Sequence, residues 1–167
     1  TGLVTFSGTA DQTLSSSAGE AFYNFTQNNS GGNTLLENNI TIKNTLSLTL
    51  GNIDAGAYKV SLGYDASNLG TLSWNAGWII GKFERWMDNT MTSQIRFPIG
   101  TVNSKRTFLP TYTYSGAGAG SMTVFFIELP AATNGLNIDD GIAVYNTFVD
   151  GYWGTSNNGF MELVNTY

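Results

Sequence analysis

The feature that most constrains this chain is a short alternation of apolar and polar residues that recurs along its length. Segments such as Ile40–Ile42 and Leu46–Leu50 place an apolar residue at every second position, which is the spacing of one face of a β-strand. Gly, Asn and Asp separate these segments. Only Lys82–Met91 offers a candidate for helical spacing. The pattern predicts an all-β protein.

In residues 1–90 the expected strands are short and are joined by brief polar links. Such closely spaced strands suit a β-solenoid, in which each turn of the chain stacks on the next. Asn29, Asn39 and Asn44 fall at the expected corners, where asparagine side chains form ladders. A plain antiparallel sandwich fits the same alternation. We predict a solenoid-like unit over residues 1–90, with the sandwich as the alternative.

Residues 91–167 contain longer and more aromatic segments. Ser121–Leu129 includes an unbroken apolar run from Val124 to Ile127, which indicates burial on both faces. We predict an antiparallel β-sandwich here, packed on the first unit or continuous with it in one domain. Its expected strands and connections are Gln94–Ile99, Thr107–Tyr114, Ile142–Val149, Tyr152–Trp153 and Phe160–Val164, with a Gly-rich loop at Ser115–Gly120 and a turn at Leu136–Asp140.

The stretch Gly81–Thr101 separates these two patterns and holds many of the few charged residues. We predict that it joins the two units and that Phe83, Trp86 and Phe97 are its buried anchors. Replacing Trp86 with alanine would then cost about 3 to 5 kcal/mol, as for other large core truncations.

The composition excludes several classes of protein. Only 11% of the residues are charged and the net charge is -5 with 7 basic residues, which argues against a nucleic-acid partner. No apolar run approaches the roughly 18 residues of a membrane span, so no membrane insertion is expected. Cysteine and histidine are absent, which removes disulfides, thiol catalysis and the commonest general base. Thr1-Gly2 leads directly into an expected strand, so we expect a mature product or an excised segment.

The acidic residues offer three candidate sites for hydrolysis, at Glu84 with Asp88, at Asp139-Asp140 and at Asp150. A glycosidase needs two carboxyl groups about 5 to 9.5 Å apart. Asp139-Asp140 followed by glycine is most simply a turn, and with Asn137 it is also a candidate Ca²⁺ site through oxygen ligands. We assign no catalytic, cofactor-binding or metal residues and expect no enzyme activity.

The tryptophans have two interpretations. They form a platform on which sugar rings stack, or they fill the core, as aromatic residues usually do in β-proteins. We favour the core for the set as a whole, which comprises Trp74, Trp78, Trp86 and Trp153.

Several ordered motifs resemble a repeat of large surface proteins that Bacteroidetes export through the type IX secretion system. The motifs cover nearly the whole chain and are found at Phe6–Leu14, Phe22–Thr26, Asn28–Ser30, Leu46–Ile53, Gly81–Trp86 (GKFERW), Phe97–Thr101 (FPIGT) and Gly151–Trp153 (GYW). Where relatives tend to carry Tyr-Arg-Pro, this chain has Lys105–Pro110. The resemblance implies a modular, extracellular or cell-surface protein of adhesin or filament type, and it implies no active site.

Two functional hypotheses follow. The first is a non-enzymatic structural or adhesive module that associates with other copies of itself or with neighbouring modules of a larger surface protein. The second is a carbohydrate-binding accessory module of a secreted enzyme, with a polysaccharide as its partner. No cofactor is expected in either case, apart from the Ca²⁺ considered at Asp139 and Asp140.

Overall fold

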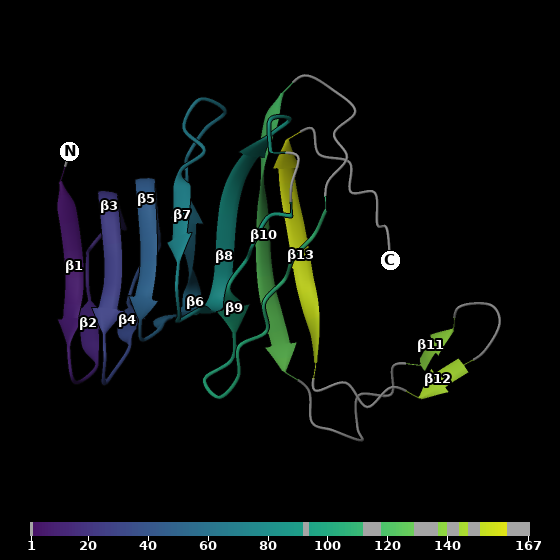
Figure 1. Ribbon diagram of the computed structural model, residues 1–167, viewed down its shortest axis with the longest axis horizontal. Helices are drawn as coiled ribbons and strands as arrows, with labels where there is room; N and C mark the ends of the chain where they lie inside the picture. The colour runs from purple at the N-terminus through teal and green to yellow at the C-terminus, as the bar shows by residue number, and fades with distance from the viewer. Residues whose placement is uncertain are drawn as a thin grey trace.

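The structure is a computed structural model that describes residues 2–91, 94–111, 118–128, 137–139, 144–146 and 151–159. Every element in these ranges is a β-strand (Figure 1), which confirms the all-β prediction. None of the described residues forms a helix that could cross a membrane. The strands are β1 (Leu3–Gly8), β2 (Gln12–Leu14), β3 (Glu20–Asn29), β4 (Thr34–Leu36), β5 (Ile40–Leu50), β6 (Ile53–Leu62), β7 (Thr71–Trp74), β8 (Ile79–Asp88), β9 (Ile99–Gly100), β10 (Ala119–Glu128), β11 (Asn137–Asp139), β12 (Val144–Asn146) and β13 (Gly151–Gly159).

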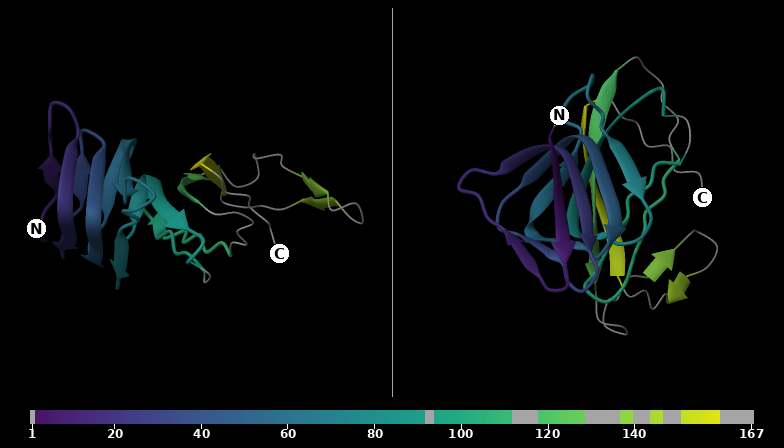
Figure 2. Two further views of the ribbon diagram at one scale, coloured as in Figure 1. Left: turned by 90° about the horizontal axis from the view of Figure 1, so that it is seen from above. Right: turned by 60° about the vertical axis from the view of Figure 1, so that its left-hand side comes forward.

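The strands from β1 to β9 pair in parallel, and the successive turns of the chain stack side by side as a solenoid (Figure 2). Each turn, or rung, contributes to three stacks of strands, which we call faces A, B and C. Face A contains β1, the ends of β3 and β5, and β7, and its registered residues include Leu3, Asn24, Thr45 and Thr71. Face B runs through β2, β4, the starts of β6 and β8, and β9, and stacks Gln12, Thr34, Ile53, Ile79 and Ile99. Face C contains the starts of β3 and β5 and the ends of β6 and β8, and stacks Phe22, Ile42, Leu62 and Arg85.

The alternation in the sequence produces this stacking because registered residues of neighbouring parallel strands point to the same side of the sheet. Phe25, Leu46 and Leu72 are aligned on face A and point inward, and the first two are fully buried. Burying one such side chain contributes about 1.5 to 3 kcal/mol to the stability of the fold. The core extends from Phe25 to Val124 as one cluster. The predicted β-solenoid is therefore confirmed.

Face C continues beyond the parallel rungs into two antiparallel strands. β10 pairs antiparallel with β8, and β13 pairs antiparallel with β10. The segment 94–111 packs against the inner side of β8, where the fully buried Phe97 lies 5.8 Å from Phe83 and 6.2 Å from Phe108 between ring centroids. This C-terminal end of the solenoid is thus covered by antiparallel strands and an aromatic layer.

The predicted sandwich for residues 91–167 is not confirmed, because β10 and β13 extend the solenoid sheet. The run Val124–Ile127 is fully buried only at Val124, since Phe125, Phe126 and Ile127 are half-buried. The described part of Ile142–Val149 is β12, and Tyr152–Trp153 lies in β13. Of the predicted loop Ser115–Gly120 the structure describes residues 118–120, and Ala119 and Gly120 already belong to β10. Phe160–Val164, Asp140 and Asp150 lie outside the described residues.

Four local predictions were wrong. The candidate helix at Lys82–Met91 is strand β8 up to Asp88, because its inward side chains alternate with outward ones. The predicted turn at Leu136–Asp140 contains strand β11, which pairs with β12. The predicted strand Gln94–Ile99 is reduced to Ile99–Gly100 in β9. Within the described part of Thr107–Tyr114, only Phe108 forms a bridge, to Phe97, and Pro110 has no amide hydrogen for a regular ladder.

Two of the three predicted anchors in Gly81–Thr101 lie in the core. Phe83 and Phe97 are fully buried and contact each other. Trp86 is half-buried and lies on the outer side of face C, since the inward positions of β8 are those of Phe83, Arg85 and Met87. The loss of stability predicted for Trp86→Ala is therefore too large. We expect this variant to lower the free energy of unfolding by about 1 to 2 kcal/mol in a urea melt, as for a partly exposed side chain.

Candidate functional site

The outer side of face C presents an aligned row of small and polar side chains. Because each residue is registered with its neighbour on the next strand, the row crosses six strands almost perpendicular to them. With strands about 4.8 Å apart, five spacings give a length of roughly 24 Å. The row consists of Ala21 on β3, Thr41 on β5, Ser61 on β6, Glu84 on β8, Thr123 on β10 and Ser156 on β13.

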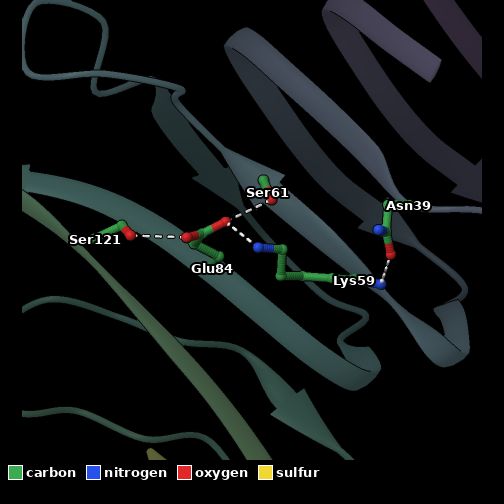
Figure 3. Close-up of polar contacts among 5 residues, drawn as sticks. All are labelled: Asn39, Lys59, Ser61, Glu84 and Ser121. Carbon is green, nitrogen blue, oxygen red and sulfur yellow. Dashed lines mark hydrogen bonds and ion pairs between the residues drawn. The ribbon is translucent and has the colours of Figure 1, made fainter. Parts of the chain in front are cut away.

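Glu84 is the centre of a polar network in this row (Figure 3). Its carboxylate accepts hydrogen bonds from the Ser61 hydroxyl at 2.8 Å and the Ser121 hydroxyl at 2.7 Å. Lys59 Nζ lies 2.6 Å from Glu84 Oε2. Asn39 Oδ1 accepts a hydrogen bond from the Lys59 backbone amide at 3.0 Å. The network therefore ties β6 to β8 and β10 across the outer face.

The Glu84 carboxylate is held in its charged form. Its burial opposes ionisation, but hydrogen bonds from Lys59, Ser121 and Ser61 and the charge of Lys59 together outweigh that effect and lower its pKa. Only 14% of its side chain is exposed. The ion pair is thus partly shielded from water and is worth more than a fully exposed pair.

We predict that Glu84→Gln lowers the free energy of unfolding by about 1.5 to 3 kcal/mol at neutral pH, the range for hydrogen bonds to charged groups. Because the pKa is depressed in the folded state, this contribution is present above the ordinary value of 4.5 and is lost as the pH falls through the folded-state pKa. Urea melts of both chains between pH 7 and pH 3 should show a difference that shrinks only below about pH 4.5. A difference that stays constant down to pH 3 would show that the charge contributes nothing.

A shallow, open recess of about 340 Å³ lies beside this network. Two aromatic side chains line it, Trp86 from β8 and Tyr64 from the loop after β6, and the Lys43 ammonium lies 5.6 Å from the Tyr64 ring centroid. The remaining lining residues are Asn39, Thr41, Lys59, Ser61, Gly63 and Glu84. The recess thus combines two aromatic rings with hydroxyl, amide, ammonium and carboxylate groups.

The predicted carboxylate pairs do not form a hydrolytic site in the described residues. Glu84 and Asp88 lie four positions apart on β8, which separates them by roughly 13 Å, beyond the glycosidase range. Asp88 instead accepts hydrogen bonds from the backbone and hydroxyl of Thr90 in a turn. The backbone of Asn137 and Asp139 lies in β11, and no cluster of three acidic groups suited to a metal occurs in the described ranges.

The four tryptophans are in different surroundings. Trp74 lies under the Arg96 guanidinium at 4.4 Å and the Lys105 ammonium at 4.8 Å. The indoles of Trp78 and Trp153 donate to the carbonyls of Thr101 and Arg106. These four contacts are internal to the protein, and Trp86 is the tryptophan that lines the recess. None of the four tryptophans is fully buried, so the prediction that they fill the core is wrong.

The N-terminal end of the solenoid is a second candidate site. Val4 and Phe6 on β1, Leu14 on β2 and Phe22 on β3 occupy inward positions, yet none of them is fully buried. Val4 is 38% exposed. Phe6 stacks on Phe25 with 5.3 Å between the ring centroids but remains half-buried. Among the described residues, no strand covers these side chains on the far side of β1 and β2. We call this surface the open end.

Sequence reasoning missed the pairing of Lys59 with Glu84. The two residues are far apart in the chain and become neighbours only because Lys59 is registered with Lys82, two positions before Glu84. Knowledge of the length of each rung would reveal this pairing, but the rungs differ in length at their corners.

No family model, curated protein or solved structure matches this chain.

Proposed function

We propose that the protein is a non-enzymatic structural module of an extracellular surface protein or fibre, joined through its open end to an adjoining module. The observation that supports this most strongly is the asymmetry of the solenoid. At the C-terminal end β10 adds the fully buried Met122 and Val124 to the core, whereas at the other end no inward-facing apolar side chain of β1 or β2 is fully buried. The low charge content and the motifs that resemble exported surface proteins support an extracellular or cell-surface location.

The partner of the open end is a further parallel rung of β-strands. Gly2 and Gly8 offer their carbonyls to Asn24 and Ser30 of the next rung. In a regular parallel ladder alternate residues bond to the same neighbour, so the backbone groups of Leu3, Thr5 and Ser7 point to the unpaired side. An unpaired strand edge of this kind is a template for another strand.

An added rung tests the proposal. A copy of residues 24–44 placed directly before Leu3 continues the natural register, because Leu3 and Thr45 both align with Asn24. We expect a gain of about 2 to 4 kcal/mol in the free energy of unfolding, since stacked rungs stabilise their neighbours and the open-end side chains become buried. A scrambled extension of the same composition is the control. Equal stability of the two extended chains would contradict the proposal.

The edge itself is tested by Thr5→Pro, which removes one outward amide and leaves the β1–β3 ladder intact. This substitution should abolish the gain in stability of the extended chain, whereas Thr5→Val should retain that gain.

Sedimentation velocity at rising concentration then identifies the partner of the open end. Dimers of the unextended chain that Thr5→Pro disrupts would show that a second copy occupies the open end in place of an adjoining module.

A further inference from the structure

We infer that the recess between Trp86 and Tyr64 is a binding subsite for a neutral, polyhydroxylated ligand, namely one or two sugar units of a polysaccharide. This inference is independent of the open end, which lies on β1 and β2 at the start of the solenoid. The recess is lined by β5, β6, β8 and the adjoining loops. Either site can therefore fail its test without affecting the other.

The size and lining of the recess favour a small ligand with both apolar and polar surfaces. A volume of about 340 Å³ is at the lower end for small-molecule sites. Trp86 and Tyr64 offer aromatic surface for the C–H faces of a sugar ring. Thr41 and Asn39 add a hydroxyl and an amide that donate and accept hydrogen bonds. This combination matches a polyol better than a purely apolar molecule.

The two charged residues that line the recess favour a neutral ligand over an ionic one, and Lys43, which contacts the Tyr64 ring, is not among the lining residues. Lys59 and Glu84 compensate each other at 2.6 Å, so the pair presents no net charge to a ligand. The Lys59 ammonium carries three N–H groups, and one ion-pair contact leaves others for a ligand hydroxyl. The Glu84 carboxylate is fixed by two serine hydroxyls, so the polar groups are already in place before a ligand arrives. Such preorganisation reduces the entropic cost of binding.

The polar row on face C continues from the subsite along one line across the strands. On the β10 side the row continues through Thr123, which is registered with Glu84, and Ser156 on β13, which is registered with Thr123. The row is roughly 24 Å long at about 4.8 Å per strand, and it extends the recess into a linear track. We therefore expect the protein to bind an extended chain of several sugar units more tightly than a single unit.

The test is native-gel affinity electrophoresis of the full chain in gels that contain mannan, xylan, β-glucan or galactan, with heparin and polygalacturonate as charged polymers. We expect at least one neutral polymer to retard the protein. Calorimetry with a hexasaccharide of that polymer should give a saturable Kd. Trp86→Ala should weaken this Kd by roughly tenfold or more, as for the loss of one aromatic contact.

Thr41→Phe provides a second variant that fills the recess from an outward position and removes no contact of the core. It should abolish binding while the melting temperature stays close to that of the parent chain. Tyr23→Ala is the matched control, since Tyr23 is a 43% exposed aromatic residue that does not line the recess, and it should leave the Kd unchanged. The inference is overturned if no neutral polymer retards the protein, or if Thr41→Phe binds as the parent chain does.

Discussion

Replacing Phe97 with alanine should lower the free energy of unfolding by about 3 to 5 kcal/mol, the largest loss we expect from a single core truncation. Phe97 is fully buried and contacts Phe83 and Phe108 on either side. The Arg85 guanidinium lies 6.0 Å from its ring centroid. Removing the ring would leave a cavity between β8 and the segment that covers the C-terminal end of the solenoid.

Chemical denaturation at neutral pH measures this effect. Phe97→Leu is the matched variant, because it keeps most of the apolar volume and should cost much less than the alanine. A loss of under about 1 kcal/mol for Phe97→Ala would show that segment 94–111 is only loosely attached. The stacking of aromatic side chains at this end would then contribute little to stability.

Gly51→Ala should also lower the free energy of unfolding severely, by about 3 kcal/mol or more, because the new methyl group is disfavoured both by the backbone conformation and by steric overlap. Gly51 has a φ of 71°, a left-handed conformation that costs other residues about 1 to 2 kcal/mol. An added Cβ would also lie 2.3 Å from the Asn29 carbonyl and 2.6 Å from the Gly32 carbonyl. Here the corners of successive rungs approach too closely for any side chain.

Gly56→Ala separates the two penalties. Gly56 has a φ of 52°, yet an added Cβ would meet nothing within 4 Å. We expect this variant to lose only about 1 kcal/mol, the cost of the backbone conformation alone. Thermal melts of the two variants should therefore differ clearly. Equal losses would show that corner stacking at Gly51 is looser than the solenoid requires.

Alternation together with short, closely spaced strands predicted the solenoid. The apolar residues of Ile40–Ile42 and Leu46–Leu50 specify which side of each strand faces inward, which a sandwich would also satisfy, and the brief links between short strands favour stacked rungs. The alternation failed after Met91, where Phe97 and Phe108 form a bridge and bury their rings without a regular strand. Their burial depends on contacts with β8, which no local pattern records.

The functional surface was harder to predict for a related reason. The sequence predicts Trp86 in the core because aromatic residues usually fill it, but the alternation of β8 places Phe83, Arg85 and Met87 inward instead. A buried arginine in this series conceals the alternation, since Arg85 reads as an outward residue in the sequence. The sequence offers only neighbours within Gly81–Thr101 as partners of Glu84, whereas its partner in the structure is Lys59 from the preceding rung.

Amide hydrogen exchange along β1, followed by NMR, tests the central claim most directly, namely that the solenoid ends in an open edge that accepts another rung. In the chain as it stands, Val4 and Phe6 should be protected because they bond to β3, whereas Leu3, Thr5 and Ser7 should exchange rapidly. Adding the copy of residues 24–44 should protect Leu3, Thr5 and Ser7 as well. Uniform protection of β1 without the extension, or rapid exchange of Thr5 with it, would contradict this account.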